Sequence, residues 1–185
     1  MFCKLCEKLY SVSDLQGLTS TMAPLCYYPQ PQRPFEVVHM DFSGPYNLSN
    51  NRFKYILVMC CRLTRYLILV ATTDRTAASV AEALYYGIIL KYSAPQVLVS
   101  DQAKEFHAEL LKQLCKLCSI RQAYITTYHP SSNEIVERPM SIISPILRIL
   151  THDHKNTWNK YLPLVESCVN SGYSTTLNDN PFYAL

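Results

Sequence analysis

Five short apolar runs, and the connections between them, constrain the fold of this chain more than any other feature. In order, the runs occupy residues 35–43, 55–61, 66–72, 97–100 and 120–125. Short polar turns join the first three, which predicts an antiparallel meander. The fourth follows a helical stretch with apolar residues at Val80, Leu84 and Ile88, and such a crossover favours a parallel neighbour. A second helix is predicted over 107–118. The sequence therefore predicts an α/β fold: a five-stranded mixed sheet flanked by helices.

Three acidic residues occupy positions at which a strand or a helix could bring them together. Asp41 lies within the first apolar run, and Asp101 directly follows the fourth. Glu137 comes after Asp101 with 35 residues between them, just inside a predicted helix. Mg²⁺ and Mn²⁺ prefer hard oxygen ligands, and two such ions about 3.5–4 Å apart can hold the attacking and leaving oxygens of a phosphodiester reaction. The three acids are therefore candidate metal ligands.

The acids fall within seven short motifs that occur in a fixed order. They are MDFSGP (40–45), TRY (64–66), SDQ-x-x-EF (100–106), YHP (128–130), VER (136–138), W-x-x-x-LP (158–163) and NPF (180–182). With these motifs the chain resembles the catalytic core of retroviral and LTR-retrotransposon integrases, most closely those of the gypsy group. The resemblance implies an RNase H-like fold and the DDE reaction: 3′-end processing and strand transfer of element DNA into host DNA. It implies that Asp41 bridges two Mg²⁺ or Mn²⁺ ions while Asp101 and Glu137 each complete one.

The same resemblance implies that the segment around the start of the last predicted helix contacts DNA phosphates. The expected DNA-binding residues are Tyr128, His129, Ser131, Ser132, Asn133 and Arg138. Two local alternatives stay open: His129 packs against Pro130, and Ser131 with Glu134 forms a capping box. Glu105 is interpreted as a neighbour of the site or a surface residue rather than a ligand. The resemblance also implies a homo-oligomer that acts on DNA in the nucleus.

The chain is predicted to have three parts. Residues 1–23 contain Cys3-x-x-Cys6, half of a zinc site by spacing, with no histidine before it. The resemblance implies the remnant of an N-terminal zinc-binding domain, in which zinc at Cys3 and Cys6 is not expected. Residues 24–34 form a Pro-rich linker, and 35–185 form the catalytic core. The chain is accordingly expected to be a fragment of a Pol polyprotein.

The remaining cysteines are expected to be reduced and to pack as small core residues. The cysteines that lie in strand-like or helical apolar patterns are Cys60, Cys61, Cys115, Cys118 and Cys168. No apolar run approaches the ~18 residues that a membrane span needs.

Pro139 is the largest departure from the integrase pattern, which usually has Asn there. In a helix interior it cannot donate to the Ile135 carbonyl and clashes with it, at a cost of ~3 kcal/mol. Pro145 repeats the problem. The helix is therefore predicted either to kink or to break and restart at Pro139, and in both cases activity would fall. The alternative function is a catalytically impaired, integrase-derived DNA-binding or dimerisation module. A hydrolytic nuclease of the same fold, specific for RNA–DNA hybrids, is a third reading.

Overall fold

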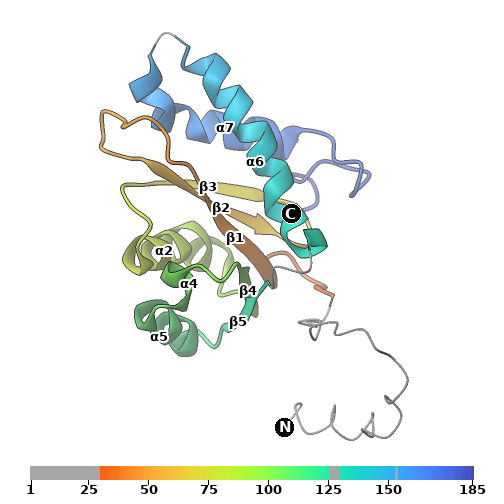
Figure 1. The fold of residues 1–185 in the computed structure, drawn as a ribbon. Coiled ribbons are helices and arrows are strands. Elements are labelled where there is room, and N and C mark those ends of the chain that lie inside the picture. The colour runs from red at the N-terminus through yellow and green to blue at the C-terminus, as the bar shows by residue number, and fades with distance from the viewer. Residues whose placement is uncertain (1–29, 126–129, 153) are drawn as a thin grey trace, which may run out of the picture.

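A five-stranded sheet forms the centre of the computed structural model, which describes residues 30–125, 130–152 and 154–185 and only the backbone over 130–134. Its strand order is β3-β2-β1-β4-β5 (Figure 1). The strands are β1 (Val37–Ser43), β2 (Tyr55–Cys61), β3 (Leu67–Thr72), β4 (Val97–Ser100) and β5 (Arg121–Tyr124). The first three run antiparallel, and β4 and β5 run parallel to β1. The predicted mixed sheet and its RNase H-like order are confirmed.

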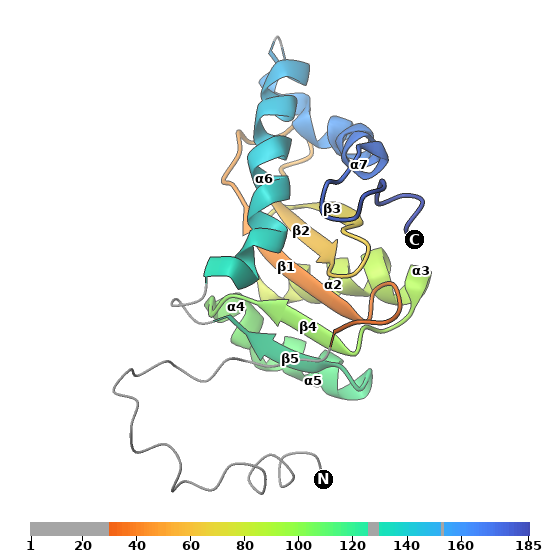
Figure 2. The same ribbon diagram turned by 90° about the vertical axis from the view of Figure 1, so that its right-hand side faces the viewer.

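Helices cover both faces of the sheet (Figures 1 and 2). One face carries α2 (Ala77–Leu84), η2 (Tyr85–Ile89), α3 (Leu90–Tyr92), α4 (Lys104–His107) and α5 (Glu109–Leu117). The other carries α6 (Pro130–Leu150), η3 (Lys155–Tyr161) and α7 (Leu162–Ser171). No helix within the described residues is long and apolar enough to cross a membrane.

Alternation along β1 decides which side chains face which helices. Met40 and Phe42 pack in the core cluster that includes Leu84 and Phe106, on the side of α2 and α4. Successive side chains of a strand point to opposite faces, so Asp41 lies on the side of α6. On that side, α6 and α7 pack over β2 and β3 through a second cluster of buried apolar residues, among them Ile56, Val58, Ile143, Leu147, Trp158 and Val165.

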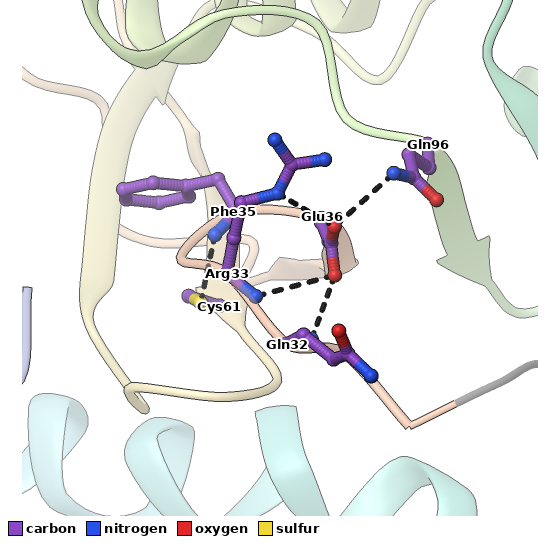
Figure 3. A network of polar contacts seen from close by, with 6 residues as sticks. All are labelled: Gln32, Arg33, Phe35, Glu36, Cys61 and Gln96. Atoms are coloured by element: carbon purple, nitrogen blue, oxygen red, sulfur yellow. Dashed lines mark hydrogen bonds and ion pairs between the residues drawn. The ribbon is translucent and has the colours of Figure 1, made fainter.

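The start of β1 is fixed by the carboxylate of Glu36 (Figure 3). It accepts hydrogen bonds from the backbone amides of Gln32 and Arg33, at 2.7 and 3.2 Å, and from the Gln96 side chain at 3.1 Å. The bond from the Gln32 amide lowers the pKa of Glu36 most, followed by the bond from the Arg33 side chain. The Glu36 carbonyl also accepts from the backbone amides of Gln96 and Val97, at 2.9 and 3.0 Å. The first residues of β1 and β4 are thereby held side by side.

The predicted helix over 107–118 is wrong in its bounds. The structure has two helices there, α4 and α5, separated by Ala108, whose backbone is extended with φ −65° and ψ 146°. Phe106 at the end of α4 is fully buried, and His107 stacks on Tyr124 of β5. These tertiary contacts hold a bend that periodicity does not reveal.

The cysteine predictions hold at four positions and fail at one. Cys60, Cys61 and Cys115 are buried, and Cys118 packs against the core, so the 115/118 pair has core spacing as predicted. Cys168, however, is exposed. It lies on α7 away from the helix positions that pack on β3, so a helical apolar pattern alone assigned it to the wrong side.

Pro139 and Pro145 lie inside one continuous helix, α6 (Figure 2). The predicted break and restart at Pro139 is therefore wrong, whereas a kink stays a prediction. The physical reason lies in packing: α6 buries Val136, Ile143 and Leu147 on the sheet, and each such side chain contributes roughly 1.5–3 kcal/mol. That is enough to offset the missing hydrogen bond and the clash of a proline ring.

Candidate active site

Asp41 lies within β1, and Asp101 directly follows β4, the parallel neighbour of β1. The register of β1 and β4 pairs Val37 with Val97 and His39 with Val99, a constant offset. Continuing it by two residues brings Asp101, just past the end of β4, opposite Asp41. Adjacent strands are about 4.8 Å apart, and the charge of Asp101 acts on the carboxyl group of Asp41.

The half-buried carboxyl group of Asp41 has a pKa well above its ordinary value. Burial raises it most, and the charges of Asp101 and Glu137 raise it further, so that it reaches about 6 instead of 3.8. Two effects oppose this rise: the backbone amide of Phe42 donates to the carboxylate at 2.7 Å, and the charge of Arg75 lies nearby. Like charges that act on one another in this way characterise carboxylates gathered in a single site.

Glu137 reaches the same site from α6, which packs on β1 and β2. Its side chain is exposed, and its charge acts on Asp41. Asp101 is held differently, because its Oδ1 accepts from the backbone amide of Ala103 at 3.0 Å as the chain turns into α4. The charges of Asp101 and Glu137 therefore both act on Asp41. The three acids come from different elements: Asp41 from β1, Asp101 from the end of β4 and Glu137 from α6.

The donor chemistry of these residues fits a hard divalent cation, since each supplies carboxylate oxygens and a cation would offset the repulsion at Asp41. Among the described residues, however, no three His, Cys, Asp or Glu side chains stand in position to hold a metal ion. The side chain of Glu137 is exposed on the first half of α6. Tyr46 supports the second half of α6, because its hydroxyl bonds both Ser43 and Ser144, at 2.8 and 3.0 Å.

An ion pair that sequence reasoning missed lies beside Asp41. Glu105 is only 6% exposed, and its Oε1 accepts from Nη2 and Nε of Arg75 at 2.6 and 2.8 Å. The guanidinium of Arg75 also lies over the Phe42 ring, 5.4 Å from its centroid. Glu105 is thus a buried neighbour of the site and not a surface residue, which were the two alternatives left by the sequence. Nothing in the sequence pointed to Arg75, because its partner is 30 positions away.

Replacing Arg75 with Gln is expected to lower the free energy of unfolding by about 1–3 kcal/mol, because Glu105 would stay buried without its charged partner. Urea unfolding followed by the fluorescence of Trp158 measures the change. Adding Glu105→Gln should restore much of the loss, as removal of both charges leaves no unpaired carboxylate. Equal stabilities of the wild type and the Arg75→Gln variant would contradict a structural role for the pair.

The predicted DNA-binding residues divide into three groups. Tyr128 and His129 lie outside the described residues. Ser131, Ser132 and Asn133 belong to the first turns of α6, where the side chains, like those of the proposed capping box, are not described. Arg138 is exposed and lines a cavity beside α6. The alternatives for His129 and for Glu134 therefore stay open.

Comparison with known proteins shows which family and which folds this chain matches. The family model of the integrase core domain matches residues 31–130. The chain is 27% identical over 159 residues to the retrovirus-related Pol polyprotein from transposon 412 of Drosophila melanogaster, covering 86% of this chain and 13% of that protein. It is 25% identical over 167 residues to gypsy retrotransposon integrase-like protein 1 of Bos taurus, covering 90% of this chain and 33% of that protein. The chain thus spans a third or less of these relatives.

The fold is also similar to a solved structure, the HTLV-2 integrase catalytic core domain in complex with magnesium in its trimeric form. The TM-score is 0.67 at 13% sequence identity, and the match covers 84% of this chain and 99% of the other. At this identity the likeness establishes the fold, a five-stranded mixed sheet with flanking helices, and nothing finer.

Proposed function

Since this chain belongs to the integrase core domain family, we propose that it is a polynucleotidyl transferase core for DNA integration, carrying out 3′-end processing and strand transfer of element DNA into host DNA. One observation carries the proposal: the charges of Asp101 and Glu137 both act on the half-buried carboxyl of Asp41. These are the acids that the DDE pattern selects, and they come from three different elements of the fold.

The reaction is a displacement at phosphorus. The attacking oxygen, from water during end processing or from a DNA 3′-hydroxyl during joining, bonds to phosphorus as the bond to the leaving oxygen breaks. Asp41, Asp101 and Glu137 would hold the Mg²⁺ or Mn²⁺ ions through their carboxylate oxygens. When bound, the ions supply Lewis-acid stabilisation of the attacking and leaving oxygens. Arg75, fixed by Glu105, keeps a positive charge beside Asp41.

Assembly and location follow as further parts of the proposal. Exposed Tyr86 and Leu90, on η2 and α3, support self-association into a homo-oligomer. The DNA contacts are those of Tyr128, His129, Ser131, Ser132, Asn133 and Arg138. The place of action is the nucleus, where the target DNA lies. The predicted zinc-binding segment 1–23 and residues 24–29 of the predicted linker lie outside the described residues.

The impaired-module alternative rests on Pro139, which lies inside α6 two positions after Glu137. A gel assay separates it from the proposal. The purified chain is incubated with a branched DNA that mimics the joined product, and with an RNA–DNA hybrid, in Mg²⁺, in Mn²⁺ and in a chelator. We expect metal-dependent resolution of the branched DNA and an intact hybrid. Hydrolysis of the hybrid alone would identify a nuclease, and a folded protein inactive on both substrates would support the impaired module.

A further inference from the structure

A cavity of about 680 Å³ lies between α6, the C-terminal end of α7 and the turn that joins β2 to β3. One wall is the side of α6 that carries Ile135, Arg138 and Ile142. The cavity belongs to the size range of small-ligand sites, roughly 300–1,000 Å³. Among the described side chains, those of Asp41, Asp101 and Glu137 do not line it, so the cavity lies apart from these acids.

Three arginines give the cavity its charge. Arg62 and Arg65 come from the β2–β3 turn and Arg138 from α6, and the lining contains no Asp or Glu among the residues that the structure describes. Hydroxyl side chains of the segment after α7, such as Thr175 and Thr176, add neutral hydrogen-bonding groups.

The rest of the lining is apolar. Ile135, Ile142 and Ile146 on α6 face Val169 of α7 across the cavity. Guanidinium groups bind phosphate oxygens in a bidentate way, and apolar side chains contact sugar and base. A ligand with one anionic end and one less polar end matches both halves of this surface. A nucleotide within a nucleic-acid strand has that chemistry.

The position of the cavity relative to the acids favours DNA. Glu137 and Arg138 are consecutive in α6, so their side chains leave the helix roughly 100° apart at nearly the same height. The charge of Glu137 acts on Asp41 on one side, while Arg138 lines the cavity on the other. The clustered carboxylates repel phosphate, so a strand that reaches them needs cations nearby, and these arginines are placed to supply them.

We propose that this cavity binds one nucleotide of the DNA strand that passes the acidic site, with its phosphate on Arg62, Arg65 and Arg138 and its sugar and base on the isoleucines. In taking DNA as the ligand, the inference rests on the proposed function. It extends the DNA contacts from the start of α6 to the β2–β3 turn.

A charge-only substitution inside the cavity gives the sharpest test. Ile142 is 48% exposed, so a polar residue there should leave the fold intact. We expect Ile142→Glu to bind fluorescein-labelled branched DNA at least fivefold more weakly than Ile142→Gln, by anisotropy in a chelator at low salt. The gap should shrink as salt rises, because screening weakens the repulsion. Equal affinities of the Glu and Gln variants would overturn the proposal.

The arginines are tested by a second pair of variants that remove equal charge. One carries Arg62→Gln, Arg65→Gln and Arg138→Gln. The control replaces the three exposed cations Lys112, Lys116 and Arg121 on α5 and β5 with Gln. The slope of log K against log [salt] falls by ~0.7–0.9 for each phosphate that the protein no longer neutralises. We expect a decrease of about 0.7–0.9 in the arginine variant, which loses one phosphate contact, and no decrease in the control.

Binding and activity are measured separately, so the two proposals fail in different ways. Loss of DNA affinity in both cavity variants supports the inference even if the wild type resolves no branched DNA. An active wild type whose cavity variants bind DNA like the controls would overturn the inference and leave the proposed function standing. In that case a different anionic partner, such as an acidic peptide, would be the next occupant to test.

Discussion

Replacing Asp41 with Asn is expected to abolish metal-dependent resolution of branched DNA and, at the same time, to stabilise the folded protein at neutral pH. Activity should fall on the order of 100-fold or more, because the amide removes one of the charges proposed to hold the ions. Stability should rise because the wild type holds a half-buried carboxylate against two like charges. Opposite changes in function and stability distinguish an active-site acid from a structural one.

The way in which stability changes with pH gives the sign of the contribution of Asp41. The pKa of Asp41 is about 6 in the folded state and 3.8 ordinarily, so the wild type loses stability as pH rises from 3.8 through 6. The Asn variant should therefore be more stable by about 1–3 kcal/mol above pH 6 and gain nothing below pH 3.8, at roughly 1.4 kcal/mol per pKa unit.

His39, two residues earlier on β1, changes stability with pH in the opposite direction. Burial, with Arg62 and Arg65, lowers its pKa to about 3 from 6.5, so its contribution to stability is lost as pH falls from 6.5 toward 3. Between pH 4 and 6 in the wild type, the contributions of Asp41 and His39 to the pH dependence of stability offset each other. Asp41→Asn should uncover the loss of stability on acidification that His39 causes.

Urea unfolding between pH 4 and 8, with and without Mg²⁺, measures both contributions. Mg²⁺ should stabilise the wild type by offsetting the repulsion among the acids, and stabilise Asp41→Asn much less. Glu82→Gln, an exposed acid on α2, serves as the charge control and should change neither stability nor activity. An Asp41→Asn protein that retains strand resolution would remove Asp41 from the catalytic site.

Replacing Pro139 with Asn is expected to stabilise α6 and raise metal-dependent activity. Asn supplies the amide that the Ile135 carbonyl lacks and removes the clash with the ring, which together are worth ~3 kcal/mol in an ideal helix interior. Because α6 is already continuous, we expect a gain of about 1–2 kcal/mol. Glu137 precedes Pro139 by two positions, so a better-ordered turn there should hold the acid nearer Asp41 and increase the rate about 3–10-fold.

Pro145→Asn provides a matched control on the same helix. Pro145 is exposed and eight positions beyond Glu137, so its replacement should stabilise α6 by a similar amount without changing the rate. Urea unfolding and the branched-DNA assay are run on both variants. Greater stability without greater activity in Pro139→Asn would show that the proline does not displace Glu137.

The sequence by itself determined the sheet and the approximate place of the acids. Alternating apolar residues and short turns are local signals, so five strands could be placed within two residues of their observed bounds. The helix before β4 implied the crossover that makes β4 parallel to β1. Asp101 after a strand end followed from motifs read along the chain, whereas Glu137, predicted just inside a helix, lies two turns into α6, which begins at Pro130.

The tertiary structure alone decided how these parts meet. The alignment of Asp101 with Asp41 depends on the register of β1 and β4. The contacts of Glu36 with Gln96 and Val97 fix this register. The Arg75–Glu105 pair, the bend at Ala108 and the arginine-lined cavity each depend on groups far apart in the chain. Pro139 stays within α6 because the helix is held by burial on the sheet. Local patterns report backbone preference, whereas packing free energy, summed over distant contacts, decides where that preference is overridden.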